Sequence, residues 1–350
     1  MHILILGASY GSLLSTKFLM AGHDATLVCQ RPGAALINAE GTVLRLTLRG
    51  EDVPRLISSV GQPGSLRAMT PSEVAPEEYD LICLAMGEPQ YSAPEVKALM
   101  GRIAASGKPV LSVMNMPPLP YLARIEGLDP ASLFACYADP SVWDGFEPGL
   151  MSLCSPDPQA FRPPDEKPNL VQVGLPTNFK AAPFANPVHT DILRQLEADI
   201  DAVTLDGKDV PVKLRVNRSI FVPLAKWSMV MTGNYRCVMP GAARPIRDAG
   251  HGDLDASAEI YGWVDALVRD LGASPDDQVP FEKYARAAES LLKPSSAARA
   301  IDAGVRRIER VDKLVQKVAA ARGMQHDAVD AIVALVDAKL SANQGQLRAG

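Results

Sequence analysis

The hydrophobic and polar positions at the start of the chain follow first a strand pattern and then a helical one. Ile3 to Leu6 form an all-apolar run that ends at Gly7, as expected for a strand buried on both faces of a parallel sheet. From Leu13 to Ala21 apolar residues recur at helical spacing, and Gly-His-Asp at 22–24 ends that pattern. A second apolar run covers Ala25 to Cys29. This strand–helix–strand opening has the length of the first half of a dinucleotide-binding fold.

The alternation of strands and helices continues further along the chain. Short apolar runs at 80–85 and 109–113 flank a helical pattern at 93–105, so we expect further parallel strands. Prolines are frequent between Asp129 and Pro187, where we expect irregular connections and edge strands.

After about Asp206 the strands give way to long helical patterns. These cover residues 223–231, 255–271, 280–292, 298–322 and 327–343. The pattern at 298–322 places apolar residues on one face and charges on the other, which is typical of a helix that packs on a core. We therefore expect an α/β Rossmann-type domain over residues 1–205 and an all-helical domain over residues 206–350.

Length, charge and cysteine content narrow the class of protein. A chain of 350 residues with 47% hydrophobic residues is long enough for two or three domains with a sizeable core. The net charge of −5 argues against a nucleic-acid partner. The first residues lack the pattern of a signal peptide and no run of 18 apolar residues occurs, so we expect a cytoplasmic protein with no membrane partner. The five cysteines are widely spaced, which favours reduced thiols, and no cluster has the spacing of metal ligands.

A glycine-containing turn follows the first predicted strand. Gly7, Ala8, Ser9, Tyr10, Gly11 and Ser12 lie where a diphosphate-binding turn belongs, because amides at a helix start attract phosphate oxygens. The spacing departs from GxGxxG, since serines stand at 9 and 12 and the second glycine is at 11. The alternative is a tight turn that binds no ligand.

The residue after the second strand bears on the choice of nucleotide. Folds that prefer NAD usually carry a carboxylate there, whereas this chain has Cys29-Gln30-Arg31. The guanidinium of Arg31 could bind a 2′-phosphate, which favours NADP(H) as the cofactor. The alternative is a solvated loop arginine.

The helical half contains a few polar residues in apolar surroundings. Lys226 stands between apolar neighbours, which lowers the pKa of a lysine toward the range useful for proton transfer, although a snorkelling surface lysine fits the same pattern. Asn234 follows eight residues later and could share a helix face with Lys226 or cap the helix. Ser295 and Ser296 precede a predicted helix, where serines act as caps, and Glu309 could form an i,i+4 ion pair with Lys313 on that helix.

Taken in order, these residues resemble the ketopantoate reductase family over nearly the whole chain. The resemblance implies a Rossmann domain followed by a helical domain like that of 6-phosphogluconate dehydrogenase, with NADP(H) as cofactor. It implies that Lys226 protonates the substrate carbonyl, that Asn234 and Ser296 hold the substrate, and that Glu309 orients the lysine or binds a polar group. Asn115 would lie near the nicotinamide.

Two positions depart from the family pattern. Val230 stands where the family carries an asparagine, and Met86, which we place in the cofactor site, stands in a run that lacks the family's lysine. Each lost charge-assisted hydrogen bond is worth about 1.5–3 kcal/mol, so we expect a bulkier or less polar carbonyl substrate than ketopantoate.

Two other functions remain open. One is an opine- or hydroxyacid-type dehydrogenase, which usually relies on a histidine–carboxylate pair, and the five histidines show no obvious partner of this kind in a cleft of the helical domain. The other is an NADP-binding protein without catalysis. By analogy with proteins of this plan, we expect a homodimer.

Overall fold

The computed structural model describes residues 1–345, which form two compact units. The first unit comprises Met1–Met86, Gln90–Arg124 and Ser141–Pro223, and the second comprises Gly87–Pro89, Ile125–Pro140 and the chain from Leu224 onward. The first unit therefore runs past the expected boundary at residue 205, because a late strand completes its sheet. The last five residues of the expected helical domain, 346–350, lie outside the described part of the chain.

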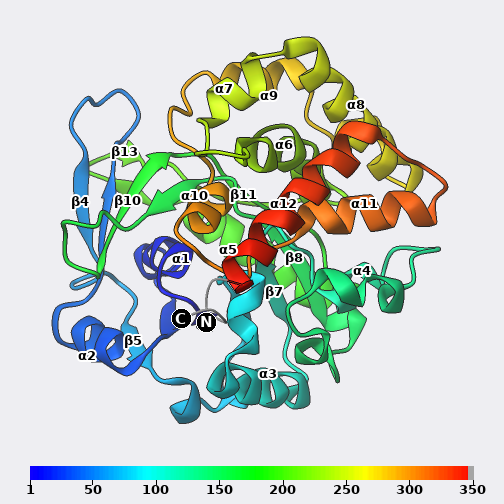
Figure 1. Cartoon of the computed structure of the whole chain (residues 1–350). Helices are drawn as coiled ribbons and strands as arrows, with labels where there is room; N and C mark the ends of the chain where they lie inside the picture. The colour runs from blue at the N-terminus through cyan, green and yellow to red at the C-terminus, as the bar shows by residue number, and fades with distance from the viewer. Residues whose placement is uncertain (346–350) are drawn as a thin grey trace. The chain divides into compact units, whose positions relative to one another are not determined.

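An eight-stranded sheet forms the centre of the first unit (Figure 1). Its strands, in spatial order, are β14 (Leu214–Val216), β11 (Phe179–Ala181), β8 (Met151–Ser155), β7 (Val110–Val113), β6 (Leu81–Leu84), β1 (His2–Leu6), β2 (Asp24–Val28) and β5 (Leu66–Met69). All pairings from β5 to β8 are parallel, and β11 runs antiparallel to β8. The order from β5 to β8 is that of the doubly wound Rossmann fold, and the chain reverses its direction of winding between β1 and β6.

The helices of the first unit mostly follow the predicted pattern. They are α1 (Tyr10–Met20), α2 (Arg31–Glu40), α3 (Pro94–Ser106), α4 (Leu119–Leu122) and α5 (Pro187–Asp201). The strands predicted at 3–6, 25–29, 80–85 and 109–113 and the helices predicted at 13–21 and 93–105 are confirmed to within a few residues. The core lies between sheet and helices, with the β1 residues from Ile3 onward fully buried.

Two smaller sheets were not predicted. One has the order β4 (Arg55–Ser58), β3 (Val43–Leu46), β10 (Leu170–Leu175) and β9 (Gln159–Phe161), and the other pairs β12 (Thr204–Leu205) with β13 (Lys208–Asp209). The expectation of irregular connections and edge strands between Asp129 and Pro187 is confirmed in part, since 3₁₀ turns occur there and β9 lies at an edge of its sheet. It is wrong for β8, which lies inside the large sheet with all five residues buried.

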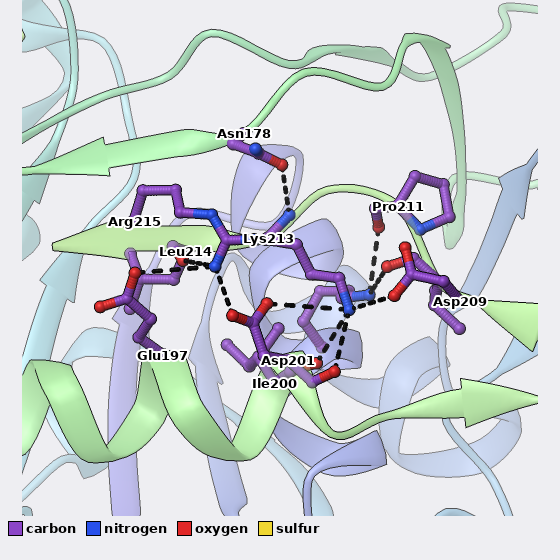
Figure 2. A network of polar contacts seen from close by, with 11 residues as sticks. Asn178, Glu197, Ile200, Asp201, Asp209, Pro211, Lys213, Leu214 and Arg215 are labelled. Atoms are coloured by element: carbon purple, nitrogen blue, oxygen red, sulfur yellow. Dashed lines mark hydrogen bonds and ion pairs between the residues drawn. The ribbon is translucent and has the colours of Figure 1, made fainter. Parts of the chain in front are cut away.

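A polar network fastens the last strand of the first unit to its start. Lys17 of α1 is almost fully buried, and its Nζ donates to the carbonyl oxygens of Val210 and Pro211 at 3.2 and 3.1 Å. Lys213 lies close to Pro211 and Asp209 (Figure 2), and its Nζ is 2.7 Å from Asp209 Oδ1. Arg215 of β14 in turn bonds Asp201 of α5 at 2.5 Å.

Every strand described in residues 1–345 lies in the first unit, so the second is all-helical as expected. Its helices are α6 (Lys226–Met229), α7 (Ile246–His251), α8 (Leu254–Asp270), α9 (Phe281–Ala288), α10 (Ser296–Asp302), α11 (Val311–Ala321) and α12 (Asp327–Gly345). A π-helix, Val230–Asn234, continues α6, and α7, α8, α10 and α11 all contact this π-helix. Short 3₁₀ helices across the chain are Pro71–Glu73, Pro76–Glu78, Glu88–Ser92, Pro130–Cys136, Pro140–Trp143, Pro148–Leu150, Val222–Ala225, Tyr235–Cys237 and Pro275–Asp277.

The single long helix predicted at 298–322 is wrong. The structure has two helices there, α10 and α11, separated by an irregular segment at 303–310. Gly304 has a φ of +83°, a conformation that glycine adopts easily and that ends a helix. Among the described residues, no helix is long and apolar enough to span a lipid bilayer.

Candidate functional site

The turn between β1 and α1 is built around Gly7. Its φ is +106°, and its N–H donates to the carbonyl oxygen of Val28 at 3.1 Å. A Cβ at this position would lie 2.6 Å from the carbonyl oxygen of Ala85, which follows β6. Glycine is therefore required for both conformation and space, at the point where the sheet reverses its winding and where such folds bind ligands.

The rest of the turn keeps α1 close to the sheet. A Cβ on Gly11 would lie 3.0 Å from the Ile5 side chain, so glycine at 11 allows the helix to approach β1. Ser12 donates its hydroxyl to the carbonyl oxygen of Ala8 at 2.6 Å, and Ser9 is the residue before Tyr10, the first of α1. The serines at 9 and 12 thus leave a formed helix start, although the spacing is not that of GxGxxG.

Arg31 lies beside a cavity at the carboxyl ends of β2 and β5. The cavity has a volume of about 400 Å³, and its polar lining comes from Arg31, Asn38, Arg67, Thr70 and Glu73. Hydrogen bonds from Thr70 lower the pKa of Glu73, and the charges of Arg31 and Arg67 act in the same direction. With two guanidinium groups and one carboxylate that is bonded to Thr70, the cavity has a net positive lining. Arg67 was not predicted, because nothing in the sequence pattern places it opposite Arg31.

Met86 and Asn115 lie on the same side of the sheet, after β6 and β7. The Met86 side chain packs against Gly7, and the Met86 N–H donates to the Tyr91 hydroxyl at 3.0 Å. Asn115 is half-buried, and its Oδ1 is shielded from solvent with no hydrogen-bond partner among the described residues. A buried acceptor of this kind fits a ligand that brings an N–H group.

In the second unit, Lys226 is the first residue of α6. It is half-buried between two buried neighbours, Ala225 and Trp227, which agrees with the apolar setting expected from the sequence. In an α-helix, eight residues would leave Asn234 about 80° away from Lys226 around the axis. A π-helix turns more slowly, at about 4.4 residues per turn, so the segment 230–234 brings Asn234 back to the side of Lys226.

The serine pair divides into a cap and an exposed residue. Ser295 is the N-cap of α10, since its Oγ accepts from the Ala298 N–H at 3.1 Å and donates to the carbonyl oxygen of Asn234 at 2.7 Å. Ser296 is exposed at the first position of α10. Ser295 therefore ties the α10 start to the end of the π-helix and leaves the Ser296 hydroxyl at the surface of the unit.

Glu309 lies in the irregular segment before α11, so its predicted helical ion pair with Lys313 is wrong. Lys313 instead pairs with Asp337 at 3.3 Å. The carbonyl oxygen of Glu309 accepts from the Tyr235 hydroxyl at 2.6 Å, and its Oε1 accepts from the Glu88 N–H at 3.3 Å.

Glu88 is a buried carboxyl group that sequence reasoning missed. It is 3% exposed, and both of its oxygens accept from the Ala138 N–H, at 3.0 and 3.2 Å. Burial raises the pKa of Glu88 to about 7, and the nearby Glu309 charge raises the pKa further, against the hydrogen bond from Ala138. A charged residue shortly after the buried strand β6 was the available signal. Its burial depends on residue 138, which is far away in sequence.

Three histidines lie beside carboxylates, whereas the sequence suggested no such pair in a cleft of the helical domain. His2 Nε2, on an exposed side chain at the start of β1, lies 3.2 Å from Asp24 Oδ2. His23 Nε2 lies 3.0 Å from Asp199 in the first unit, and His326 Nε2 lies 3.6 Å from Glu259 in the second. Burial lowers the pKa of His23, with the chain's amino group acting in the same direction. The Glu259 side chain is 73% exposed, so the pair in the helical unit is a surface contact.

The fold is shared with reductases and dehydrogenases of known structure. A D-mandelate dehydrogenase in complex with NADH and anilino(oxo)acetate is 14% identical with a TM-score of 0.65, over 98% of this chain and 100% of that one. A ketopantoate reductase from Ralstonia eutropha is 17% identical with a TM-score of 0.62, over 98% and 100%. A 2-dehydropantoate 2-reductase from Methylococcus capsulatus is 12% identical with a TM-score of 0.66, over 98% of each chain.

These likenesses confirm the predicted fold class, a Rossmann-type domain joined to a helical one. At such low identity they establish the fold. No family model matches the sequence, and no curated protein matches it either.

Proposed function

We propose that this protein is an NADP(H)-dependent oxidoreductase that interconverts a carbonyl and a hydroxyl group on a small molecule. The observation that carries the proposal is the Gly7 turn, where a side chain is excluded at the switch point of a Rossmann sheet. Solved structures with this fold include one bound to NADH, which supports a nicotinamide dinucleotide as cofactor.

In this proposal the residues of the first unit hold the nucleotide. The turn from Gly7 through Ala8, Ser9, Tyr10 and Gly11 to Ser12 receives the diphosphate at the start of α1. Arg31, in its positively lined cavity, receives a 2′-phosphate, which favours NADP(H) over NAD(H). Met86 packs beside Gly7 at the nicotinamide end, and the unsatisfied Oδ1 of Asn115 accepts from the carboxamide.

The bound nucleotide supplies or accepts the hydride, and residues of the second unit handle the substrate. Lys226 donates a proton to the carbonyl oxygen during reduction. Asn234 and Ser296 bind polar groups of the substrate, and Glu309 orients Lys226 or binds a further polar group. Because Val230 is apolar and 2% exposed, the substrate finds one polar contact fewer than ketopantoate needs. A bulkier, less polar 2-oxo acid or ketone fits better.

Steady-state kinetics and calorimetry test this function together. Purified protein should oxidise NADPH in the presence of at least one member of a panel of aliphatic, branched and aryl 2-oxo acids and ketones. With that substrate, Lys226→Ala should lower kcat about 10²–10⁴-fold, the range expected for a lost proton donor. The Kd for NADPH should stay unchanged.

The control is Lys339→Ala, since Lys339 is a half-buried residue of α12 that bonds only the carbonyl of Gly241 among the described residues. Full activity of Lys226→Ala would refute the role of the lysine. Tight NADPH binding without turnover on any substrate would favour the non-catalytic alternative, and activity that needs an amine co-substrate would favour an opine-type dehydrogenase. We further propose a cytoplasmic homodimer, and sedimentation equilibrium tests the assembly.

A further inference from the structure

An arginine from a distant part of the chain reaches the turn that follows β1. Arg162, directly after β9, donates from Nη2 to the carbonyl oxygen of Ala8 at 2.8 Å. Ala8 stands between Gly7 and the start of α1, so the guanidinium lies next to the backbone on which a diphosphate would rest. The two positions are 154 residues apart, and both belong to the first unit.

The cation at Arg162 is not neutralised by a neighbouring acid. Within residues 1–345 no carboxylate forms an ion pair with it, and the carbonyl of Ala8 uses one of its five N–H donors. The nearby thiol of Cys29 does not neutralise Arg162 either, because burial raises the pKa of the thiol and keeps the sulfur uncharged. The guanidinium therefore has several donors and a full positive charge available for an anion.

The loop that carries Arg162 is fixed at its other end. Asn169 is buried and donates to the carbonyl oxygen of Gly41 at 2.9 Å. Glu166 bonds Arg45 at 2.6 Å, and Lys167 bonds Glu40 at 2.7 Å. The strand that leads to Arg162, β9, also contacts α1. Glu166 of the loop and Glu40 of α2 are thus engaged away from Arg162, and the loop spans from the end of α2 to the turn.

We propose that Arg162 binds the diphosphate of the nucleotide and compensates for the serines that replace glycines at 9 and 12. This assignment rests on the proposed function. A guanidinium suits the task because its planar donors bind two phosphate oxygens at once. The nucleotide is then held by two arginines with separate tasks, with Arg162 at the diphosphate and Arg31 at the 2′-phosphate.

Calorimetry with three probes separates these tasks. ADP carries the diphosphate without a 2′-phosphate, adenosine 2′-monophosphate carries the 2′-phosphate without a diphosphate, and NADPH carries both groups. Arg162→Ala should weaken ADP and NADPH about tenfold and leave adenosine 2′-monophosphate within about twofold. Arg31→Ala should weaken adenosine 2′-monophosphate and NADPH and leave ADP unchanged. Arg162→Lys, which keeps the charge but not the planar fork, should fall between the wild type and Arg162→Ala for ADP.

Lys167→Ala is the matched control, because it removes a positive charge from the same loop at a residue paired with Glu40. It should bind all three probes as the wild type does. Arg162 is exposed, so its variants should fold, and their thermal midpoints verify this. Unchanged ADP binding by Arg162→Ala, or equal weakening of ADP and adenosine 2′-monophosphate, overturns the assignment. A wild type that binds none of the three probes overturns the proposed function instead.

Discussion

Single residues show where local chemistry could be predicted and where it could not. The role of Gly7 follows from its place after an apolar run, and a serine cap before α10 follows from a polar pair before a helical pattern. Arg162 carries no such local sign, and the only local sign at Glu88 is a charged residue shortly after a buried strand. One acts on a turn 154 residues away and the other is buried against Ala138, so both depend on contacts that only the folded chain creates.

The carboxyl group of Glu88 makes stability depend on pH. Burial raises the pKa of Glu88 from its ordinary 4.5 to about 7 in the folded chain, so the folded state holds the proton more tightly than the unfolded state does. The contribution of the protonated Glu88 to the free energy of unfolding is therefore complete below about pH 4.5 and is lost as the pH rises through 7. Glu88→Gln keeps a neutral acceptor for the Ala138 N–H. On going from pH 5 to pH 8, its free energy of unfolding should rise relative to that of the wild type by on the order of 1–3 kcal/mol.

Urea unfolding at these two pH values measures the effect of Glu88→Gln, with Glu95→Gln as control. Glu95 is an exposed residue of α3, and its substitution should shift both curves alike. If Glu88→Gln and Glu95→Gln respond to pH in the same way, Glu88 does not hold its proton near neutrality.

At the scale of elements, periodicity predicts helices well and their interruptions poorly. Residues 298–322 keep a helical pattern throughout, yet Gly304 stops the helix and the chain resumes only at Val311. The π-helix at 230–234 has no sequence signal, although it decides whether Asn234 shares a side with Lys226. The four-stranded sheet of β4, β3, β10 and β9 was missed because its strands are short and come from distant parts of the chain.

Tyr235 holds the interrupted segment in place. Its hydroxyl donates to the carbonyl oxygen of Glu309 and accepts from the Val311 N–H at 3.0 Å. The side chain is 4% exposed, so Tyr235→Phe leaves two buried backbone groups without a hydrogen-bond partner. Each of these groups should lower the free energy of unfolding by up to about 1–3 kcal/mol. Hydrogen exchange should speed up over residues 303–312, which contain the proposed substrate contact at Glu309.

Tyr284→Phe provides the comparison for Tyr235→Phe. The Tyr284 hydroxyl is also buried but has no hydrogen-bond partner among the described residues, so its removal should be close to neutral. Equal unfolding free energies and equal exchange in the two variants would show that Tyr235 does not fix Glu309.

For the whole molecule, composition and periodicity predict the two-part plan but not how the chain is shared between the parts. The second unit takes Gly87–Pro89 and Ile125–Pro140 from the sequence of the first half. These short segments have no pattern of their own, and only their contacts assign them. The end of the first unit is likewise decided by pairing, because β14 adds to the large sheet through β11.

The buried Lys17, which joins α1 to residues 210–211 of the first unit, predicts that stability depends on pH in the alkaline range. Lys17 joins α1 to the chain at 210–211, and burial lowers its pKa from 10.5 to about 7, with the charge of Lys213 acting in the same direction. The unfolded state therefore binds more protons between these values, and the free energy of unfolding should rise with pH from about 7 toward 10. Lys17→Met removes the amino group and should reduce this rise by on the order of 1–3 kcal/mol, whereas substitution of the exposed Lys167 by Met should leave the rise intact.

Denaturant titrations at pH 7, 8.5 and 9.5 compare how the free energy of unfolding changes with pH in the wild type and the two variants. Parallel curves for wild type and Lys17→Met would mean that the amino group is not held neutral by the fold, because a buried ammonium with its usual pKa would make no difference between these pH values.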